Sequence, residues 1–94
     1  MQTNEFYRVP ISAITNIPNG DASPNLVEAV KMLGRTMNPT YVVSSGFNPE
    51  TYEEMFIIIH NGKIVEAALL ANLEYVDAFV IDQESISTIK EMFS

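Results

Sequence analysis

The four-residue segment His60-Asn61-Gly62-Lys63 has the composition of an anion-binding turn. We expect it to join an apolar strand to a helix, and the N-terminus of a helix presents unpaired amide N–H groups and a partial positive charge. Gly62 would let an anion approach the backbone, and Lys63 would add a mobile cation. The segment is therefore a candidate phosphate or nucleotide site. The same residues also suit a plain strand-to-helix turn, in which Asn61 caps the helix and Lys63 faces solvent.

Catalytic side chains are few. His60 is the only histidine, and imidazole is a common general base because it ordinarily titrates near neutral pH. It has neither the spacing of a serine–histidine–acid triad nor a second histidine for a metal. Asp77, Asp82 and Glu84 could hold magnesium, as a nuclease requires, although Asp82 and Glu84 are better explained as the cap and first-turn acid of a helix. We assign no catalytic residue and no metal site.

An acidic stretch with one aromatic residue, Glu50, Tyr52, Glu53 and Glu54, lies on the loop that enters the third predicted strand. Such a surface can dock a basic protein partner, or occupy a nucleic-acid groove by mimicry. It can equally be an ordinary solvated rim. These four residues are the candidate partner-binding residues.

The composition limits the classes of function. The 94 residues suffice for a single domain, residues 1–94, and 47% of them are hydrophobic. The net charge of −7 has the same sign as a nucleic-acid backbone, so direct DNA binding is not expected. The absence of cysteine excludes disulfides, cysteine–zinc sites and thiol nucleophiles. We find no apolar run of about 18 residues and no signal-peptide layout, which predicts a cytoplasmic protein without a membrane segment.

The elements that would position these residues follow from periodicity and turn signals. Pro10 predicts that the first strand lies at an edge or ends there. Ser23, Pro24 and Gly34 mark a helix as its cap, first residue and terminator. The apolar run before His60 predicts a central strand covered on both faces. The expected strands are Phe6 to Ile11, Thr40 to Ser45, Glu54 to His60 and Tyr75 to Ile81, and the later helices are Lys63 to Leu73 and Gln83 to Phe93, the last capped by Asp82.

This order, strand, helix, strand, strand, helix, strand, helix, predicts a small α/β (α+β) domain. We expect a mixed sheet with about three helices, packed mostly on one face of the sheet. The helix after Gly62 has almost no polar face and should be deeply packed. Arg8 and Arg35 flank strand entries and could converge near the candidate anion site.

Three segments give Arg8 to Asp82 a resemblance to the ParB/sulfiredoxin superfamily, and specifically to the ParB-like N-terminal (ParB-like nuclease) domain. Val9-Pro10-Ile11-Ser12-Ala13-Ile14 is similar to the entry strand of the family. Gly34 to Val43 looks like its glycine, spacer, Gln-Pro and β-branched strand, with Asn38 in place of glutamine. Phe56 to Ala68 looks like its strand and phosphate-loop helix, G-x-R/H-R-x-x-A-A. The resemblance implies a ParB/sulfiredoxin-like fold with a phosphate site at this helix.

The sequence departs from the family at the phosphate loop. Aligned on Ala67-Ala68, Asn61 stands at the family's glycine, Lys63 at the first basic position and Ile64 at the arginine. Because charge-assisted hydrogen bonds are the strong ones, the resemblance implies a weakened hold on phosphate. Sulfiredoxin chemistry is excluded because it needs a cysteine. No helix-turn-helix follows Asp82, so ParB-type centromere recognition is not expected.

Three hypotheses remain. The first is a degenerate, non-catalytic ParB-like domain, encoded by a phage or plasmid, that acts by binding a protein partner. The second is a ParB-like NTPase or nuclease that binds a nucleotide with magnesium at His60 to Lys63 and has no other cofactor. The third is an acidic inhibitor of a basic nucleic-acid enzyme, with Glu50 to Glu54 and Glu66 to Asp82 presenting the charge. The sequence leaves open whether the protein is an enzyme.

Overall fold

The computed structural model describes residues 3–92. Its elements follow the predicted order, with two short 3-10 turns added: β1 (Glu5–Pro10), η1 (Ile11–Ala13), α1 (Pro24–Leu33), β2 (Thr40–Phe47), β3 (Glu54–His60), α2 (Gly62–Leu70), β4 (Tyr75–Ile81), η2 (Gln83–Ser85) and α3 (Ile86–Met92). The predicted α+β class, with a mixed sheet and three helices, is confirmed. None of the helices within these residues is long and apolar enough to cross a membrane.

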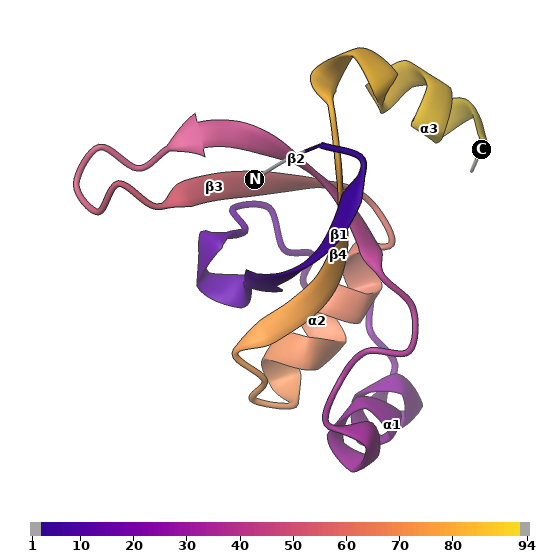
Figure 1. The fold of residues 1–94 in the computed structure, drawn as a ribbon. Coiled ribbons are helices and arrows are strands. Elements are labelled where there is room, and N and C mark those ends of the chain that lie inside the picture. The colour runs from indigo at the N-terminus through magenta and orange to yellow at the C-terminus, as the bar shows by residue number, and fades with distance from the viewer. Residues whose placement is uncertain (1–2, 93–94) are drawn as a thin grey trace.

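The four strands form one sheet in the order β1-β4-β2-β3. β1 pairs with β4 and β2 pairs with β3 in antiparallel fashion, whereas β2 and β4 are parallel. In Figure 1 the β2–β3 hairpin reaches away from the body, and α2 and α1 lie together on one side of the sheet. α1 packs on α2, and α3 contacts β3.

The core lies between α2 and one face of the sheet. Strand residues of alternating positions point into it, and the small side chains of Ala67 and Ala68 allow α2 to lie close to them. The prediction of a deeply packed helix is confirmed for residues 64–68. It is wrong for Leu69 and Leu70, the last two residues of the helix, which are about half exposed.

β3 is an edge strand, so the prediction of a central position is wrong. The chain itself covers part of its outer edge. The Thr15 amide donates to the Phe56 carbonyl (3.1 Å). The Asn16 side chain donates to the Ile58 carbonyl (3.0 Å) and accepts from the Ile58 amide (2.7 Å). A loop and one amide side chain thus replace a neighbouring strand, which explains how an apolar run is accommodated at an edge.

The local turn signals are confirmed. The Ser23 hydroxyl accepts from the Leu26 amide, Pro24 begins α1, and Gly34 ends it with φ +70°. β1 is an edge strand and ends at Pro10. Asp82 caps the last helical segment by accepting from the Ser85 amide, and this segment begins with η2 rather than with a regular α-turn. Phe93, predicted as its last residue, lies outside the described residues.

Candidate functional site

The turn before α2 has the backbone of a tight connection. Asn61 occupies the position before the helix in a left-handed conformation, with φ +61° and ψ +44°. Its side chain does not cap the helix. It donates instead to the Pro39 carbonyl at 2.9 Å, which ties the turn to the segment that leads into β2. The capping interpretation of Asn61 is therefore wrong.

A hollow of about 430 Å³ lies beside this turn, and its walls come from Asn38, Pro39, Tyr41, His60, Asn61 and Lys63. The residue at its rim with a full positive charge, Lys63, is exposed, and His60 is half-buried with its ring centroid 5.7 Å from that of Tyr41. Three of the four predicted anion-site residues thus border one concavity, formed where β2, β3 and α2 meet. Gly62 does not line it.

Gly62 makes a close approach inside the protein. A Cβ atom at this position would lie 3.0 Å from Pro18 Cγ, 3.2 Å from Pro18 Cδ and 3.4 Å from Ile58 Cγ2. The Pro18 ring therefore rests on the first residue of α2. The absence of a side chain at Gly62 makes room for this ring, on the side that was predicted to admit an anion.

Glu66, one turn into α2, was expected to present charge at the surface, which is wrong, and it was not predicted as a ligand-site residue. Only 4% of its surface is exposed. Its carboxylate accepts hydrogen bonds from three successive backbone N–H groups, those of Gly20 (2.7 Å), Asp21 (2.9 Å) and Ala22 (3.1 Å). Successive amides that converge in this way form an anion-binding nest. One signal in the sequence could have identified Glu66: it is a single carboxylate within the apolar run Ile-Val-Glu-Ala-Ala, and such a residue needs polar partners if the run is buried.

These hydrogen bonds set the charge state of Glu66. The bond from the Gly20 amide, joined by those from Asp21 and Ala22, lowers the pKa of Glu66 below its ordinary value, against the opposing effect of burial. The carboxylate is thus ionised at neutral pH and fixes the loop of residues 18–22 to α2. The amides of residues 20–22 thus hold an anion that the chain itself supplies.

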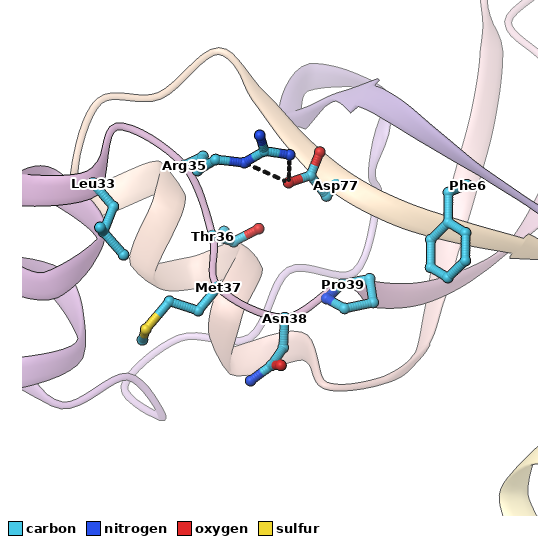
Figure 2. Close-up of a pocket in the computed structure, with 8 residues that line it drawn as sticks. All are labelled: Phe6, Leu33, Arg35, Thr36, Met37, Asn38, Pro39 and Asp77. Atoms are coloured by element: carbon cyan, nitrogen blue, oxygen red, sulfur yellow. Dashed lines mark hydrogen bonds and ion pairs between the residues drawn. The ribbon is translucent and has the colours of Figure 1, made fainter.

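The two arginines flagged in the sequence meet the same strand, β4. The Arg35 Nε and Nη2 atoms donate to Asp77 Oδ2 at 3.2 and 2.8 Å (Figure 2). Arg8 lies over the Tyr75 ring, 5.7 Å from its centroid. A second hollow of about 470 Å³ adjoins the ion pair, and it shares Asn38 and Pro39 with the first. Neither arginine lines the hollow that Lys63 borders.

Asp77, Asp82 and Glu84, considered above as an alternative magnesium site, do not form a cluster. Asp77 is paired with Arg35, whereas Asp82 accepts from Ser85 and from the Asn4 side chain. The hydrogen bond from the Ser85 hydroxyl is the main cause that lowers the pKa of Asp82. Within residues 3–92 no group of three or more histidine, aspartate or glutamate side chains could hold a metal ion.

The candidate partner-binding residues lie at the hairpin tip, residues 47–53, with Glu54 at its base. Local hydrogen bonds order the tip: the Asn48 amide donates to the Glu53 carbonyl and the Tyr52 amide to the Asn48 carbonyl, both at 2.8 Å. Tyr52 is 82% exposed and has φ +60°, a left-handed conformation that is rare for a bulky residue. Phe47, which was not predicted, is 68% exposed on the same tip.

Comparison with known proteins identifies the fold. No family model matches the chain, and no curated protein matches it. Among solved structures it is similar to the C-terminally truncated chromosome-partitioning protein ParB from Caulobacter crescentus, complexed with CTP-gamma-S. The TM-score is 0.59 at 18% identity, and the match covers 95% of this chain and 52% of that one. The chain thus has a ParB-like fold, as predicted, and spans about half the length of that protein.

Proposed function

We propose that the protein is a non-catalytic domain with a ParB-like fold that binds a basic protein partner through the hairpin tip. The observation that carries the proposal is the pairing of two exposed aromatic residues with an acidic surround on an ordered, protruding hairpin. The partner class that we favour is a basic nucleic-acid enzyme, which the domain would inhibit. An origin in a phage or plasmid and a cytoplasmic location belong to the same proposal.

The geometry of the α2 turn disfavours tight binding of phosphate. Pro18 covers Gly62, and Glu66 accepts hydrogen bonds from the loop amides of residues 20–22, which leaves these amides unavailable to a phosphate. Among the residues that the structure describes, Lys63 is the one cation that borders the hollow, and the position where the family has an arginine is the buried, aliphatic Ile64. A phosphate there would have one charge-assisted partner, whereas strong phosphate sites combine several.

The hairpin tip has the properties of a binding surface. Aromatic residues dominate the energetics of protein interfaces. Phe47 and Tyr52 are largely exposed, whereas an aromatic residue with a purely structural role is buried. Glu50 and Glu53 flank them, and residues 44–54 contain no lysine or arginine, so the charge favours a basic partner. The left-handed conformation of Tyr52 costs free energy, and strain of this kind is concentrated at functional positions.

A capture experiment tests this proposal. The full chain is immobilised and exposed to lysate of its native host, in parallel with the double variant Phe47→Ala/Tyr52→Ala. We expect the wild-type chain to retain a basic protein that the double variant loses, and a Glu50→Gln/Glu53→Gln variant to bind it more weakly at low salt. Glu74→Gln, which removes one exposed charge far from the tip in sequence, is the matched control.

Two results would contradict the proposal. If the double variant retains the same proteins as the wild type, the hairpin tip is not the binding surface. Salt screens exposed charges over about 10 Å at 0.1 M. An affinity for the partner that does not change between roughly 50 and 500 mM salt would therefore rule out a contribution of Glu50 and Glu53 to binding. The inhibitor proposal further predicts that the purified partner loses activity on addition of the wild-type chain alone.

Nucleotide binding is the second candidate, and one observation favours it: the similar ParB structure is complexed with CTP-gamma-S, while His60, Asn61 and Lys63 border one hollow here. The ligand would be a nucleoside triphosphate with magnesium. Calorimetric titration of CTP and ATP tests it. Micromolar, magnesium-dependent binding that disappears in Lys63→Ala would replace the first proposal, and phosphate release above a heat-killed control would make the protein an enzyme.

A further inference from the structure

The hollow of about 470 Å³ beside the ion pair of Figure 2 is built from three parts of the chain. These are the end of α1, the loop of residues 34–39 that leads to β2, and the adjacent strands β1 and β4. Ala78 points into the core, so its neighbours Asp77 and Phe79 point to the opposite face of the sheet. Phe6 stands opposite Phe79 and shares this face. The hollow thus combines a charged pair with apolar walls.

The ion pair has hydrogen-bonding capacity left over. The Arg35 Nε and Nη2 atoms both donate to one oxygen of Asp77, Oδ2. A guanidinium has further N–H groups, and the Asp77 Oδ1 atom accepts no hydrogen bond from any residue within 3–92. The side chain of Arg35 is 66% exposed and that of Asp77 is 24% exposed. Arg35 can therefore bind a further carboxylate, and Asp77 a further cation.

The charge of the pair selects the class of ligand. Arg35 and Asp77 together carry no net charge, so a simple anion would be repelled by Asp77 and a simple cation by Arg35. A zwitterion can place its carboxylate at Arg35 and its ammonium group at Asp77, and unlike charges then alternate around the cluster. An α-amino acid carries these two groups on one carbon atom. The ion pair thus favours an amino acid over a phosphate or a metal ion.

The walls of the hollow indicate the side chain that such an amino acid would carry. Leu33 and Met37 are each 56% exposed, and Phe6 is 66% exposed. In Figure 2, Leu33 and Met37 lie on one side of the hollow and Phe6 lies on the other. Large apolar side chains that surround a recess are typical of ligand sites, because a bound apolar group removes them from water. The walls therefore favour an apolar side chain.

Thr36 is an independent sign of a missing polar partner. It is 4% exposed, and its Oγ1 atom has no hydrogen-bond partner among the described residues. Buried polar side chains almost always have a partner, since an unpaired one costs free energy. In Figure 2 the Thr36 hydroxyl points toward the middle of the residues that line the hollow. A carboxylate bound there could accept a hydrogen bond from it.

We infer that this hollow binds an apolar α-amino acid. The ligand carboxylate accepts hydrogen bonds from Arg35 and Thr36, and its ammonium group donates to Asp77 Oδ1. Its side chain lies against the apolar walls. This proposal depends neither on the hairpin tip nor on the hollow beside the α2 turn.

Titration of the isotope-labelled full chain with L-phenylalanine, followed by amide chemical shifts, tests the inference. We expect millimolar affinity, because the ligand is small and the hollow is open, with shifts at residues 34–39 and none at the hairpin tip. Two analogues each lack one charged group: 3-phenylpropionate has no ammonium group and phenethylamine has no carboxylate. Each should bind at least tenfold more weakly, because a charge-assisted hydrogen bond is lost.

Reciprocal variants test the assignment of the two charges. Asp77→Asn should bind 3-phenylpropionate at least as tightly as L-phenylalanine, because the repulsion of an anion is removed. Arg35→Gln should do the same for phenethylamine. Each comparison is made between ligands within one variant, so it does not depend on how stable that variant is. Arg8→Gln is the matched control, because Arg8 also contacts a β4 residue but does not line this hollow, and it should keep the wild-type order of ligands.

Two further variants test the hydroxyl and the apolar wall. Thr36→Val should weaken binding of L-phenylalanine roughly 3- to 10-fold without lowering the melting temperature, because it removes an unpaired hydroxyl and keeps the shape. Met37→Ala should also weaken binding. Met32→Ala is its control, because Met32 is 86% exposed on α1 and does not line the hollow.

Three results would overturn the inference. The first is an absence of amide shifts at residues 34–39 at the highest soluble concentration of L-phenylalanine. The second is equal affinity for L-phenylalanine and both analogues, which would show that the ion pair does not recognise the zwitterion. The third is a Thr36→Val protein with a lower melting temperature and unchanged affinity, since the hydroxyl would then have a structural role only.

Discussion

The α2 turn and the hairpin tip were both singled out by residue type, yet the structure treats them in opposite ways. At the α2 turn, contacts from residues more than 40 positions away fill the available space: Pro18 covers Gly62, and the loop amides of residues 20–22 bind Glu66. At the hairpin tip the hydrogen bonds that order residues 48–53 are local, and the aromatic side chains remain exposed. A turn that looks like a ligand site can thus be completed from within the fold, while a surface loop stays available to a partner.

The largest expected effect is a loss of thermal stability when the Glu66 carboxylate on α2 is replaced. Glu66→Gln should lower the melting temperature by roughly 10 °C, because a neutral amide accepts backbone hydrogen bonds more weakly than a carboxylate and its NH₂ group faces the loop donors. Thermal unfolding followed by circular dichroism measures it. Glu74→Gln, an exposed position, is the control and should leave the midpoint unchanged. A shift in Glu66→Gln no larger than that of the control would show that the loop is held by other contacts.

The pH dependence sharpens the same point. The pKa of Glu66 is lower in the folded protein than its ordinary value of 4.5, so its stabilising effect is complete above that pH and is lost as the pH falls through the folded pKa. The stability gap between wild type and Glu66→Gln should therefore be full at pH 6 and should shrink below about pH 4.5. Urea unfolding of both proteins between pH 6 and 3 measures the gap. A constant gap across this range would contradict ionised Glu66 as its source.

A middle-sized effect is expected at the contact of Pro18 with Gly62. Replacing a helical glycine by alanine ordinarily stabilises by about 0.5–1 kcal/mol. Here the new Cβ meets a ring on a loop that Glu66 holds in place, so Gly62→Ala should destabilise by about 0.5–1.5 kcal/mol. In a Pro18→Ala background the same substitution should stabilise. Chemical unfolding of the four proteins in this double-mutant cycle checks the change of sign. Stabilisation in both backgrounds would mean that the turn has room for a ligand.

The smallest expected effect on stability is at the tip, and it has the opposite sign. Tyr52→Asn should stabilise by about 0.5–1 kcal/mol, because asparagine tolerates the left-handed conformation better than a bulky side chain. It should also weaken capture of the basic partner at least tenfold, because the aromatic anchor is lost. Tyr52→Phe keeps the ring and should change neither quantity. A Tyr52→Asn protein that is more stable and binds equally well would remove Tyr52 from the interface.

Much of the fold could be predicted from the sequence because its signals act over a few residues. Ser23, Pro24 and Gly34 set the ends of α1 through their own hydrogen bonds and backbone preferences. Pro10 ends β1, and Asp82 caps the segment after β4. The apolar patterns and turn signals predicted the order of elements. The ParB-like fold was predicted separately, from the resemblance of three segments to that family.

The amino-acid sequence by itself determined the local elements, the acidic charge and the absence of thiol chemistry, since each depends on residue identity or on near neighbours. Tertiary structure alone decided the edge position of β3, the burial of Glu66 against the loop of residues 20–22, and the ring contacts that link Phe6, Phe79, Tyr41 and His60 across the sheet. The physical reason is distance along the chain. Strand order and register bring together residues separated by tens of positions, and no short-range pattern specifies which of them will meet.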